Sequence, residues 1–569
     1  MRSLRILILF PVIVLLFCAP ANARVDSNSA TPNRVSSRAN YTPSAWLDVG
    51  RIKLFVNNHG TLDYPNGFAG GYWPRVEYAD IIVFDVGPCL IGKVNSSPAM
   101  GYSVWGSSYS PGPVINGLAA KYAAPGDSML YRVYRISHGD TRENNPDFDR
   151  WPVALGAPVD PAGHPCLYGN QTLWTLFNNL DSAALPLGWD FRPRFARLPV
   201  EIHQAVYAHG VPGRDTMNLL ANVAFFEWTI INKGNVSIDS AYFSLWTDID
   251  FNGAEDNMPG VDTVNQVGYC WQPYDTGYGG SYIGVPRAVG FVLLYGPTVD
   301  SPESMATFQG KRRENARNLS MSSFWGIIDD SVPDSSFIGP AYSVGTAWNI
   351  ARGLDKYGNP IVDSVTHQVT KFPYSGDPLT GTGWLNSIYR GGGAGFNMFS
   401  GPFTMAPNDT QWVMMALVPV MHQDRVTCVY LLRQYASILR SMSYSALVDT
   451  SYVPPSPLPP PPYTNEPSPP ALFQNYPNPF NAQTTISFAV PWAGAHVIDP
   501  NGNWAPNATS VRIVVFDAVG RQIIVLMNEE KTPGIYEVNF DGTGLASGTY
   551  FYRLETAGQT KVKKMVLLR

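Results

Sequence analysis

Residues 471–491 read ALFQNYPNPFNAQTTISFAVP, and two related segments follow, VRIVVFDAVGRQIIVL (511–526) and GLASGTYFYRLETAGQTKVKKMVLLR (544–569). Apolar residues recur at every second position, as in Ile486, Phe488 and Val490, which is the period of a strand with one buried face. Pro, Asn and Gly separate the segments and favour turns. The sequence therefore predicts a small, Ig-like antiparallel β-sandwich.

The motif order in this region resembles the type A C-terminal sorting domain of proteins exported by the type IX secretion system of Bacteroidetes-like bacteria. The matching motifs are YPNPFN (476–481), FDxxGR (516–521), GLxSGTY (544–550) and KMV (564–566). The resemblance implies recognition by the secretion machinery. The chain departs from the family over Trp492 to Ser510, which forms an insertion where the family usually has a short turn. The residues expected to carry sorting are Pro477, Asn478, Pro479, Phe480, Gly520, Gly548, Tyr550, Lys563 and Lys564.

Two details of this domain can be predicted from the pattern. Gly548 precedes the tyrosine-containing strand, where a tight turn would favour a positive φ. The last strand, 561–568, carries lysines on both faces, which suits an edge strand because charge discourages unwanted sheet pairing.

The N-terminus has the pattern of a secretory signal peptide over residues 1–23. Arg2 and Arg5 precede an apolar run from Ile6 to Phe17, and Ala21-Asn22-Ala23 suits cleavage. A lipoprotein site at Cys18 is disfavoured because a large Phe precedes it. We expect Sec-type export to the periplasm, no transmembrane segment in the mature chain, and a secreted or surface-attached protein.

Composition favours an extracellular, mainly β protein. The chain of 569 residues has 51 Gly, 49 Pro and 13% aromatic residues, but only 15% charged residues. Its net charge of -5 argues against nucleic acid as a partner, because such a partner would require a basic surface.

The expected organisation is a mobile leader (24–46), a large all-β region of β-sandwich type (47–450), a proline-rich linker (451–472) and the sorting domain (473–569). The large region could consist of two subdomains split near 215. A hairpin is predicted where AFFEWTII (224–231) meets Asn232-Lys233-Gly234 and a new apolar run. One amphipathic helix is predicted from Asp424 onward, closing the flank of this region.

The large region also resembles a group of big secreted proteins that carry the same sorting domain. The similar segments include WPVALGAPVDPAGHPCLYGNQTLWTLFNN (151–179), WNIARGLDKYGNP (348–360) and YSGDPLTGTGW (374–384). These segments are turns and strands, so the resemblance implies architecture and location but no chemistry.

A calcium site is the best candidate for a metal centre. Asp248, Asp250, Asp256 and Asp262 cluster in TDIDFNGAEDNMPGVD (247–262), and calcium prefers several oxygen ligands from acidic loops. The spacing is not that of an EF-hand, and a solvated acidic turn is the alternative. No other cofactor is expected.

Other motifs are weaker. Cys89, Cys166, Cys270 and Cys428 could form disulfides, but their pairing cannot be deduced from spacing. His203 and His209 could share a strand face, although no third metal ligand accompanies them. No nucleophile elbow, HExxH or phosphate-binding loop is present.

The sequence leaves two functions open. The first is a non-enzymatic binding, adhesion or structural protein that contacts extracellular glycan or cell-surface material. The second is an extracellular hydrolase acting on polysaccharide or protein. Trp73, Trp105, Trp151 and Trp384 could stack on sugars, although aromatic residues in β proteins more often belong to the core. A hydrolase should show a cleft containing carboxylates with perturbed pKa values.

Overall fold

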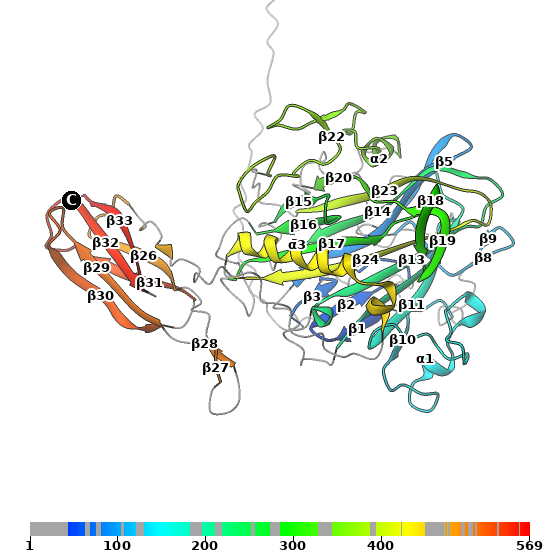
Figure 1. The fold of residues 1–569 in the computed structure, drawn as a ribbon, viewed down its shortest axis with the longest axis horizontal. Helices are drawn as coiled ribbons and strands as arrows, with labels where there is room; N and C mark the ends of the chain where they lie inside the picture. The colour runs from blue at the N-terminus through cyan, green and yellow to red at the C-terminus, as the bar shows by residue number, and fades with distance from the viewer. Residues whose placement is uncertain are drawn as a thin grey trace, which may run out of the picture. The chain divides into compact units, whose positions relative to one another are not determined.

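The computed structural model shows a mainly β protein (Figure 1). It describes residues 44–62, 69–74, 81–103, 107–120, 130–181, 196–210, 219–251, 257–272, 285–327, 344–386, 394–422 and 424–449 of the large region. In the C-terminal part it describes 471–472, 475, 478–490, 496–498, 504–506, 509–531, 534–556 and 558–568. The predicted signal peptide, nearly all of the leader and residues 451–470 of the linker lie outside these ranges.

The largest sheet of the large region has nine antiparallel strands. Its order is β10 (Tyr134–Ser137), β11 (Gln171–Asn178), β12 (Val200–Ala208), β13 (Ala224–Asn232), β24 (Thr410–Met421), β17 (Arg287–Tyr295), β16 (Val267–Trp271) and β15 (Met258–Asp262), with β7 (Ser110–Pro111) beside β11. Because β12 and β13 pair along nine residues, one continuous sheet contains both sides of position 215. The structure therefore gives no division into subdomains there.

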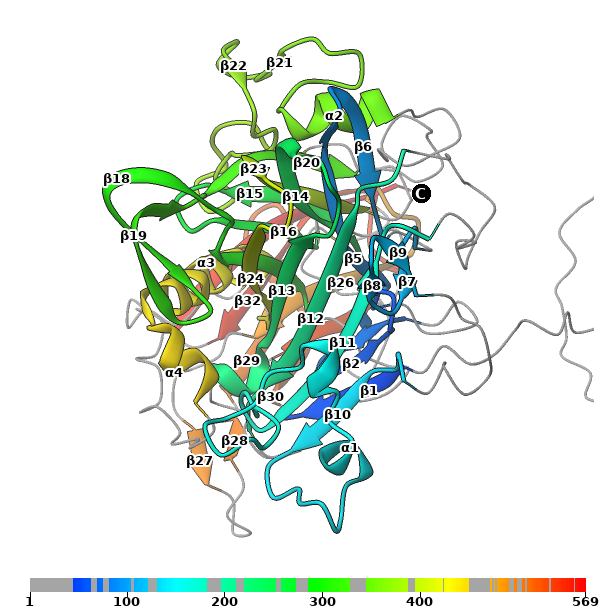
Figure 2. The ribbon, with the colours of Figure 1, turned by 90° about the vertical axis from the view of Figure 1, so that its right-hand side faces the viewer.

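Two further sheets complete the main core. One has the order β20 (Met321–Ile327), β23 (Ala394–Met405), β14 (Ile238–Ile249), β5 (Asp85–Val94) and β6 (Ser97–Gly101). The other has the order β1 (Ala45–Val49), β2 (Ile52–Val56), β3 (Gly71–Tyr72) and β4 (Ile81–Val83). Residues from all three sheets, including Leu54, Phe243 and Phe291, are buried in one hydrophobic cluster. The course of the strands that carry them can be followed in Figure 2. This layered packing confirms the predicted sandwich-type architecture.

Short elements surround these sheets. The hairpins are β8 (Val114–Ile115) with β9 (Leu118–Ala119), β18 (Thr298–Phe308) with β19 (Lys311–Asn318), and β21 (Ile361–Val362) with β22 (Val369–Thr370). The helices are α1 (Pro146–Asp149), η2 (Val153–Leu155), η3 (Leu220–Asn222), α2 (Val344–Ala351), α3 (Arg425–Ser441) and α4 (Tyr444–Val448). None of the helices in the described part of the chain is long and apolar enough to cross a membrane.

Helix α3 confirms the predicted amphipathic helix. The Asp424 carboxylate caps its N-terminus by accepting hydrogen bonds from the amides of Val426 and Thr427. The helix buries Leu432 and Leu439 against the nine-stranded sheet, where it contacts β16, β17 and β24. Its apolar face therefore covers the flank of this sheet, as expected.

The predicted hairpin at Asn232-Lys233-Gly234 is wrong. Strand β13 pairs with β12 and β24, whereas β14 pairs with β5 and β23 in the five-stranded sheet. The Asn232 side chain stabilises the crossing because its amide donates to the carbonyls of Val236, Met405 and Ala406. Both edges of β13 are already paired, so the chain turns into the second sheet.

The sorting domain consists of two principal antiparallel sheets. One contains β25 (Ala471–Leu472), β26 (Gln483–Val490) and β31 (Gly534–Asp541), and the other has the order β30 (Gln522–Lys531), β29 (Thr509–Phe516), β32 (Gly548–Thr556) and β33 (Gln559–Leu567). The predicted insertion contains a separate hairpin, β27 (His496–Ile498) with β28 (Trp504–Pro506). The domain has its own hydrophobic cluster, which includes Phe488, Ile513 and Tyr552.

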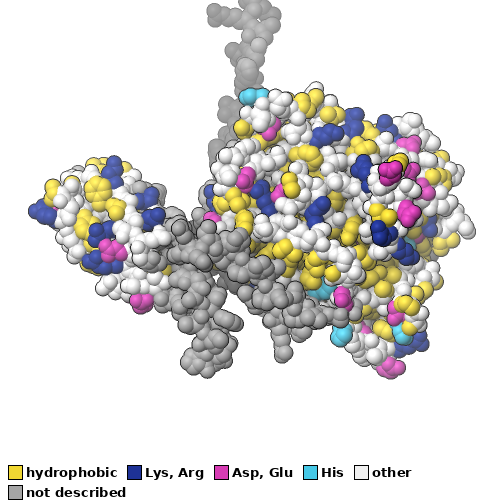
Figure 3. Space-filling model, viewed as in Figure 1, with side chains coloured by type: hydrophobic (Ala, Val, Ile, Leu, Met, Phe, Trp, Pro, Cys, Tyr) yellow, Lys and Arg dark blue, Asp and Glu magenta, His cyan; other side chains and the backbone are white. Residues whose placement is uncertain are grey.

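The described surface carries mixed charges, and the disulfides that the sequence left open are not formed among the four described cysteines. Figure 3 shows basic and acidic side chains interspersed on the visible face of the large region. The four described cysteines are free thiols, and Cys89, Cys270 and Cys428 are buried.

Candidate functional site

A cavity of about 330 Å³ lies over the face of β12 that is turned away from the main core. Its floor is formed by β12 and the end of β13, and its walls by the β8–β9 hairpin and the η2 turn. The lining residues are Pro113, Val114, Ile115, Ala154, Leu155, Gly156, Glu201, His203, Ile231 and Lys233. The walls are mostly aliphatic, and three ionisable side chains stand on the floor.

The carboxylate of Glu201 organises the floor of this cavity. One oxygen, Oε1, lies 2.9 Å from His203 Nε2 and 3.4 Å from Lys233 Nζ. The other, Oε2, accepts a hydrogen bond of 2.6 Å from the Val114 amide. Burial opposes ionisation of Glu201, but the His203 and Val114 hydrogen bonds and the Lys233 charge outweigh it and lower its pKa. Glu201 is therefore an ionised acceptor at neutral pH.

The neighbouring residues fix the position of His203. Its ring meets that of Trp174 edge-on, with the centroids 5.6 Å apart. Gly156 has a φ of 93°, and a Cβ at that position would lie 2.5 Å from His203 Cε1. A side chain at 156 would therefore be strained and would displace the imidazole.

The ionisable groups of the cavity differ in what they can offer a ligand. Glu201 is the one carboxylate among the residues that line the cavity, and its lowered pKa does not suit a general acid. Lys233 keeps 30% of its side chain exposed and can donate to a ligand, because its other contact is the shared Glu201 oxygen.

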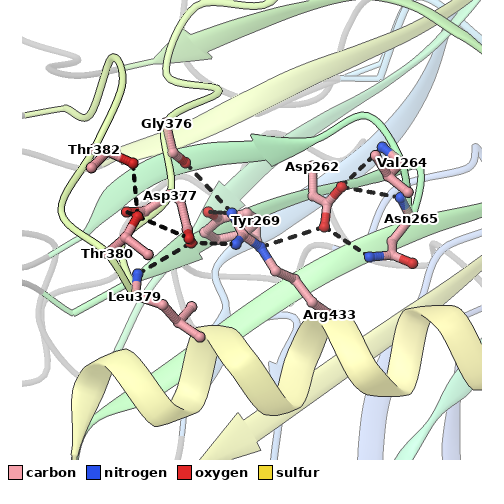
Figure 4. A network of polar contacts seen from close by, with 10 residues as sticks. All are labelled: Asp262, Val264, Asn265, Tyr269, Gly376, Asp377, Leu379, Thr380, Thr382 and Arg433. Atoms are coloured by element: carbon pink, nitrogen blue, oxygen red, sulfur yellow. Dashed lines mark hydrogen bonds and ion pairs between the residues drawn. The ribbon is translucent and has the colours of Figure 1, made fainter.

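One of the four aspartates predicted to bind calcium is engaged by a basic side chain. Asp262, at the end of β15, forms an ion pair with Arg433, with Oδ2 3.4 Å from Nε. It also accepts hydrogen bonds from the amides of Val264 and Asn265. Figure 4 shows Arg433 reaching from α3 between Asp262 and Asp377. A cation at Asp262 would have to compete with this guanidinium.

The Arg433 network connects α3 to two other parts of the fold. Nη1 of Arg433 lies 2.6 Å from Asp377 Oδ1, and Nη2 donates to the Tyr269 hydroxyl at 3.3 Å. Asp377 and Thr382 pair across a turn, and the Asp377 carboxylate anchors this turn to the helix. The network therefore has a structural role.

Two other predicted calcium ligands, Asp248 and Asp250, lie at the end of β14. Asp248 is 7% exposed, and burial raises the pKa of Asp250 to about 6. Asp256 lies outside the described residues. The described residues contain no group of three His, Cys, Asp or Glu side chains placed to hold a metal. Asp248, Asp250 and Asp262, the described members of the predicted set, are thus not grouped as a metal site.

The two histidines singled out by spacing have different environments. His203 lies in the cavity, whereas His209 is 1% exposed and its Nε2 lies 2.8 Å from the Leu447 carbonyl. The structure therefore does not bring them together as a metal pair.

Sequence reasoning missed a buried acid, Glu227 on β13, which is 6% exposed. Its carboxylate accepts hydrogen bonds from Tyr207 and Tyr444, each at 3.1 Å, and from Trp412 Nε1 at 3.0 Å. Burial raises its pKa to about 7, although these three bonds act in the opposite direction. The available signal was a charged residue within the apolar run AFFEWTII.

In the C-terminal domain, the PNPF motif is hydrogen-bonded to the end of the last strand, β33. The Phe480 amide donates to the Val566 carbonyl at 3.0 Å, the Leu568 amide donates to the Phe480 carbonyl at 2.9 Å, and Asn478 Oδ1 accepts from the Val566 amide at 2.9 Å. Phe480 itself is 2% exposed. Pro479 lies between these two contact residues, and Pro477 is outside the described residues.

The remaining predicted sorting residues lie in turns and strands. Gly520 has a φ of 84° in the turn that Asp517 caps, and the Tyr550 hydroxyl donates to the Ala546 carbonyl. The predicted positive φ at Gly548 is wrong, because this residue begins β32 and the left-handed conformation occurs at Gly544 instead, with a φ of 94°.

The lysines of the last strand occupy the predicted edge. Strand β33 is at one end of its sheet; Lys564 is exposed, and Lys563 is partly buried. Met565 and Leu567 on the inner face are fully buried. The alternation along this strand is therefore as predicted.

The C-terminal strands thus form a β-domain with its own sheets and its own hydrophobic cluster. Residues 474–568 match the family described as secretion system C-terminal sorting domain, so the chain carries the sorting domain of the type IX secretion system. This domain implies interaction with that machinery and a secreted or cell-surface location. No curated protein matches the chain.

Similarity to solved structures is low. A polysaccharide lyase shares 8% identity at a TM-score of 0.19, covering 69% of this chain and 39% of that one. The native conformation of E. coli alpha-2-macroglobulin shares 9% identity at a TM-score of 0.14, covering 94% and 40%. The chain spans about two fifths of the length of each protein.

Proposed function

We propose that the large region is a non-enzymatic binding module that acts outside the cell after Sec-type export and passage through the type IX system. The observation that carries this proposal is the cavity with Glu201, His203 and Lys233 on its floor. Its volume, aliphatic walls and few polar groups are typical of a small-ligand site.

The carboxylates support binding over hydrolysis. Glycoside hydrolysis requires two of them across one cleft, with the pKa of the acid raised. Glu201 has a lowered pKa, and Glu227, whose pKa is raised, is held by three donors in a hydrophobic cluster. The hydrolase alternative rests on Asp250, because its pKa of about 6 is raised as that of a general acid would be.

The aromatic residues narrow the ligand class. Trp73 and Trp151 are 4% and 7% exposed, and their indole N–H groups donate to Asn222 and Pro158. They belong to the core and offer no stacking platform. Trp105 lies outside the described residues, and Trp384 is partly buried against Tyr374. The ligand is therefore a single sugar residue or a side chain of similar size from extracellular or surface material, held by the aliphatic walls and Lys233.

Binding can be measured with the purified chain on a glycan array, in parallel with generic polysaccharide and protein hydrolase substrates. Lys233→Ala should abolish binding while leaving the melting temperature within about 1 °C, because such a partly exposed side chain contributes little to stability. Lys311→Ala on the exposed β19 strand is the matched control. If the chain turns over any of these substrates and the turnover depends on Asp250, the binding proposal is contradicted and the hydrolase alternative is established.

A further inference from the structure

Two acidic side chains face each other at one end of the five-stranded sheet. Asp85 is the first residue of β5, and Asp248 lies directly opposite it near the end of β14. Side chains of directly opposed residues project from the same face, with Cβ atoms roughly 4.5–5.5 Å apart. Asp85 is 0% exposed and Asp248 is 7% exposed.

This face of the sheet is turned away from the main core. Cys89 on β5 and Trp246 on β14 have the same strand parity as the two aspartates, and both belong to a separate hydrophobic cluster. Burial raises the pKa of Cys89 to about 12, and the nearby Asp85 charge adds to that effect. The two carboxylates thus lie in a region where burial penalises charge.

An independent observation comes from Asn397 on β23. It pairs across the sheet with Trp246 and with Trp325, so it lies one step diagonally from Asp248 on the same face. The side chain is 0% exposed, and within the described residues neither its Oδ1 nor its Nδ2 has a hydrogen-bond partner. A buried amide without partners costs roughly 1–3 kcal/mol, so its presence requires an explanation.

One ligand accounts for the two opposed carboxylates and for the Asn397 Oδ1 that lacks a hydrogen-bond partner. Like charges directly opposite each other destabilise a sheet, and a cation between them reverses that effect. Carboxylate and amide oxygens are the donors that calcium prefers. We propose that Asp85, Asp248 and the Asn397 amide oxygen hold a calcium ion that stabilises this end of the five-stranded sheet.

This site differs from the one that the sequence predicts. It keeps Asp248 but omits Asp262, because that carboxylate is paired with Arg433. It adds Asp85 and Asn397, which lie far before and far after Asp248 in the chain. It is also independent of the proposed binding cavity, because none of its three residues lines that cavity.

The test uses the full chain freed of metal with a chelator. Calcium at millimolar concentration should raise its melting temperature by several degrees. Terbium, which replaces calcium at oxygen sites, should luminesce when indoles are excited, because Trp246 and Trp325 flank Asn397. Asp248→Asn and Asn397→Leu should each reduce the terbium signal at least tenfold and remove the calcium shift.

Asp262→Asn is the matched control and should keep both responses. The proposal is overturned if the unmodified chain responds to neither ion, or if the Asp262 variant alone loses the response. A second result also overturns it: Asp85→Asn raises the melting temperature in the absence of calcium, and calcium does not change the melting temperature of the unmodified chain. The two aspartates would then be held together by a shared proton and not by a cation. Because Asn397→Leu introduces no charge, it keeps the test decisive where an aspartate variant fails to fold.

Discussion

Replacing Glu227 with Gln should remove a pH-dependent loss of stability. The pKa of Glu227 is raised from 4.5 to about 7 in the folded chain, where it is 6% exposed. The folded state therefore binds a proton at Glu227 more tightly than the unfolded state does. The contribution of this proton to the free energy of unfolding is fully present below pH 4.5 and is lost as the pH rises through about 7. Each tenfold change in proton affinity corresponds to about 1.4 kcal/mol, so the loss amounts to roughly 3 kcal/mol by pH 8.

The amide side chain that the Glu227→Gln substitution introduces can still accept from Trp412 and Tyr444, and the Tyr207 hydroxyl can turn to accept from it. Calorimetric melting between pH 4.5 and 8 should therefore show a shallower pH dependence for Glu227→Gln, with the variant more stable than the unmodified chain at pH 8. Tyr207→Phe, which removes one donor to the same carboxylate, should steepen the dependence instead. A variant with an unchanged pH slope and lower stability at pH 8 would refute the assigned role of burial.

Three further outcomes are expected. Arg433→Met should lower the melting temperature of the large region, corresponding to about 1–3 kcal/mol, because Asp377 loses a charged hydrogen-bond donor and Asp262 loses its ion-pair partner; an unchanged melting curve would show that the network is dispensable. Phe480→Ala should destabilise the sorting domain by about 3–5 kcal/mol in denaturant unfolding, since the ring is fully enclosed, and a smaller effect would mean that the site collapses around the gap. Charge reversal at Lys563 and Lys564 should reduce export while circular dichroism shows a folded domain, and normal amounts in the medium would leave these lysines with edge protection alone.

Local patterns predicted much of the fold because they encode local hydrogen bonds. Asp160, Asp355 and Asp517 each precede a glycine by three positions, and each carboxylate accepts from the amides two and four residues onward. Such turns can be recognised from the residues, because the side chain replaces a backbone acceptor. The Asp424 cap of α3 could be predicted for the same reason.

Non-local pairing was not predictable in this way. The turn chemistry at Asn232-Lys233-Gly234 indicates a change of direction, but the partner of β14 depends on strands that come from 85–94 and 394–405. The donors to Glu227 lie 20, 185 and 217 positions away along the chain. The candidate site has the same origin, since Val114, Glu201 and Lys233 come from three separate segments.

The contacts between the PNPF motif and β33 bear on how C-terminal truncations should be interpreted. The Phe480 amide and carbonyl are both bonded to the backbone of Val566 and Leu568, so removing only the last few residues also releases a segment almost ninety positions upstream. A shortened chain that stays in the periplasm is therefore explained equally well by unfolding of the domain and by loss of the residues that the secretion machinery recognises. Substitutions of residues on the outer face of β33, such as Lys564, distinguish these two explanations, because they leave the backbone hydrogen bonds between Phe480 and the last strand in place.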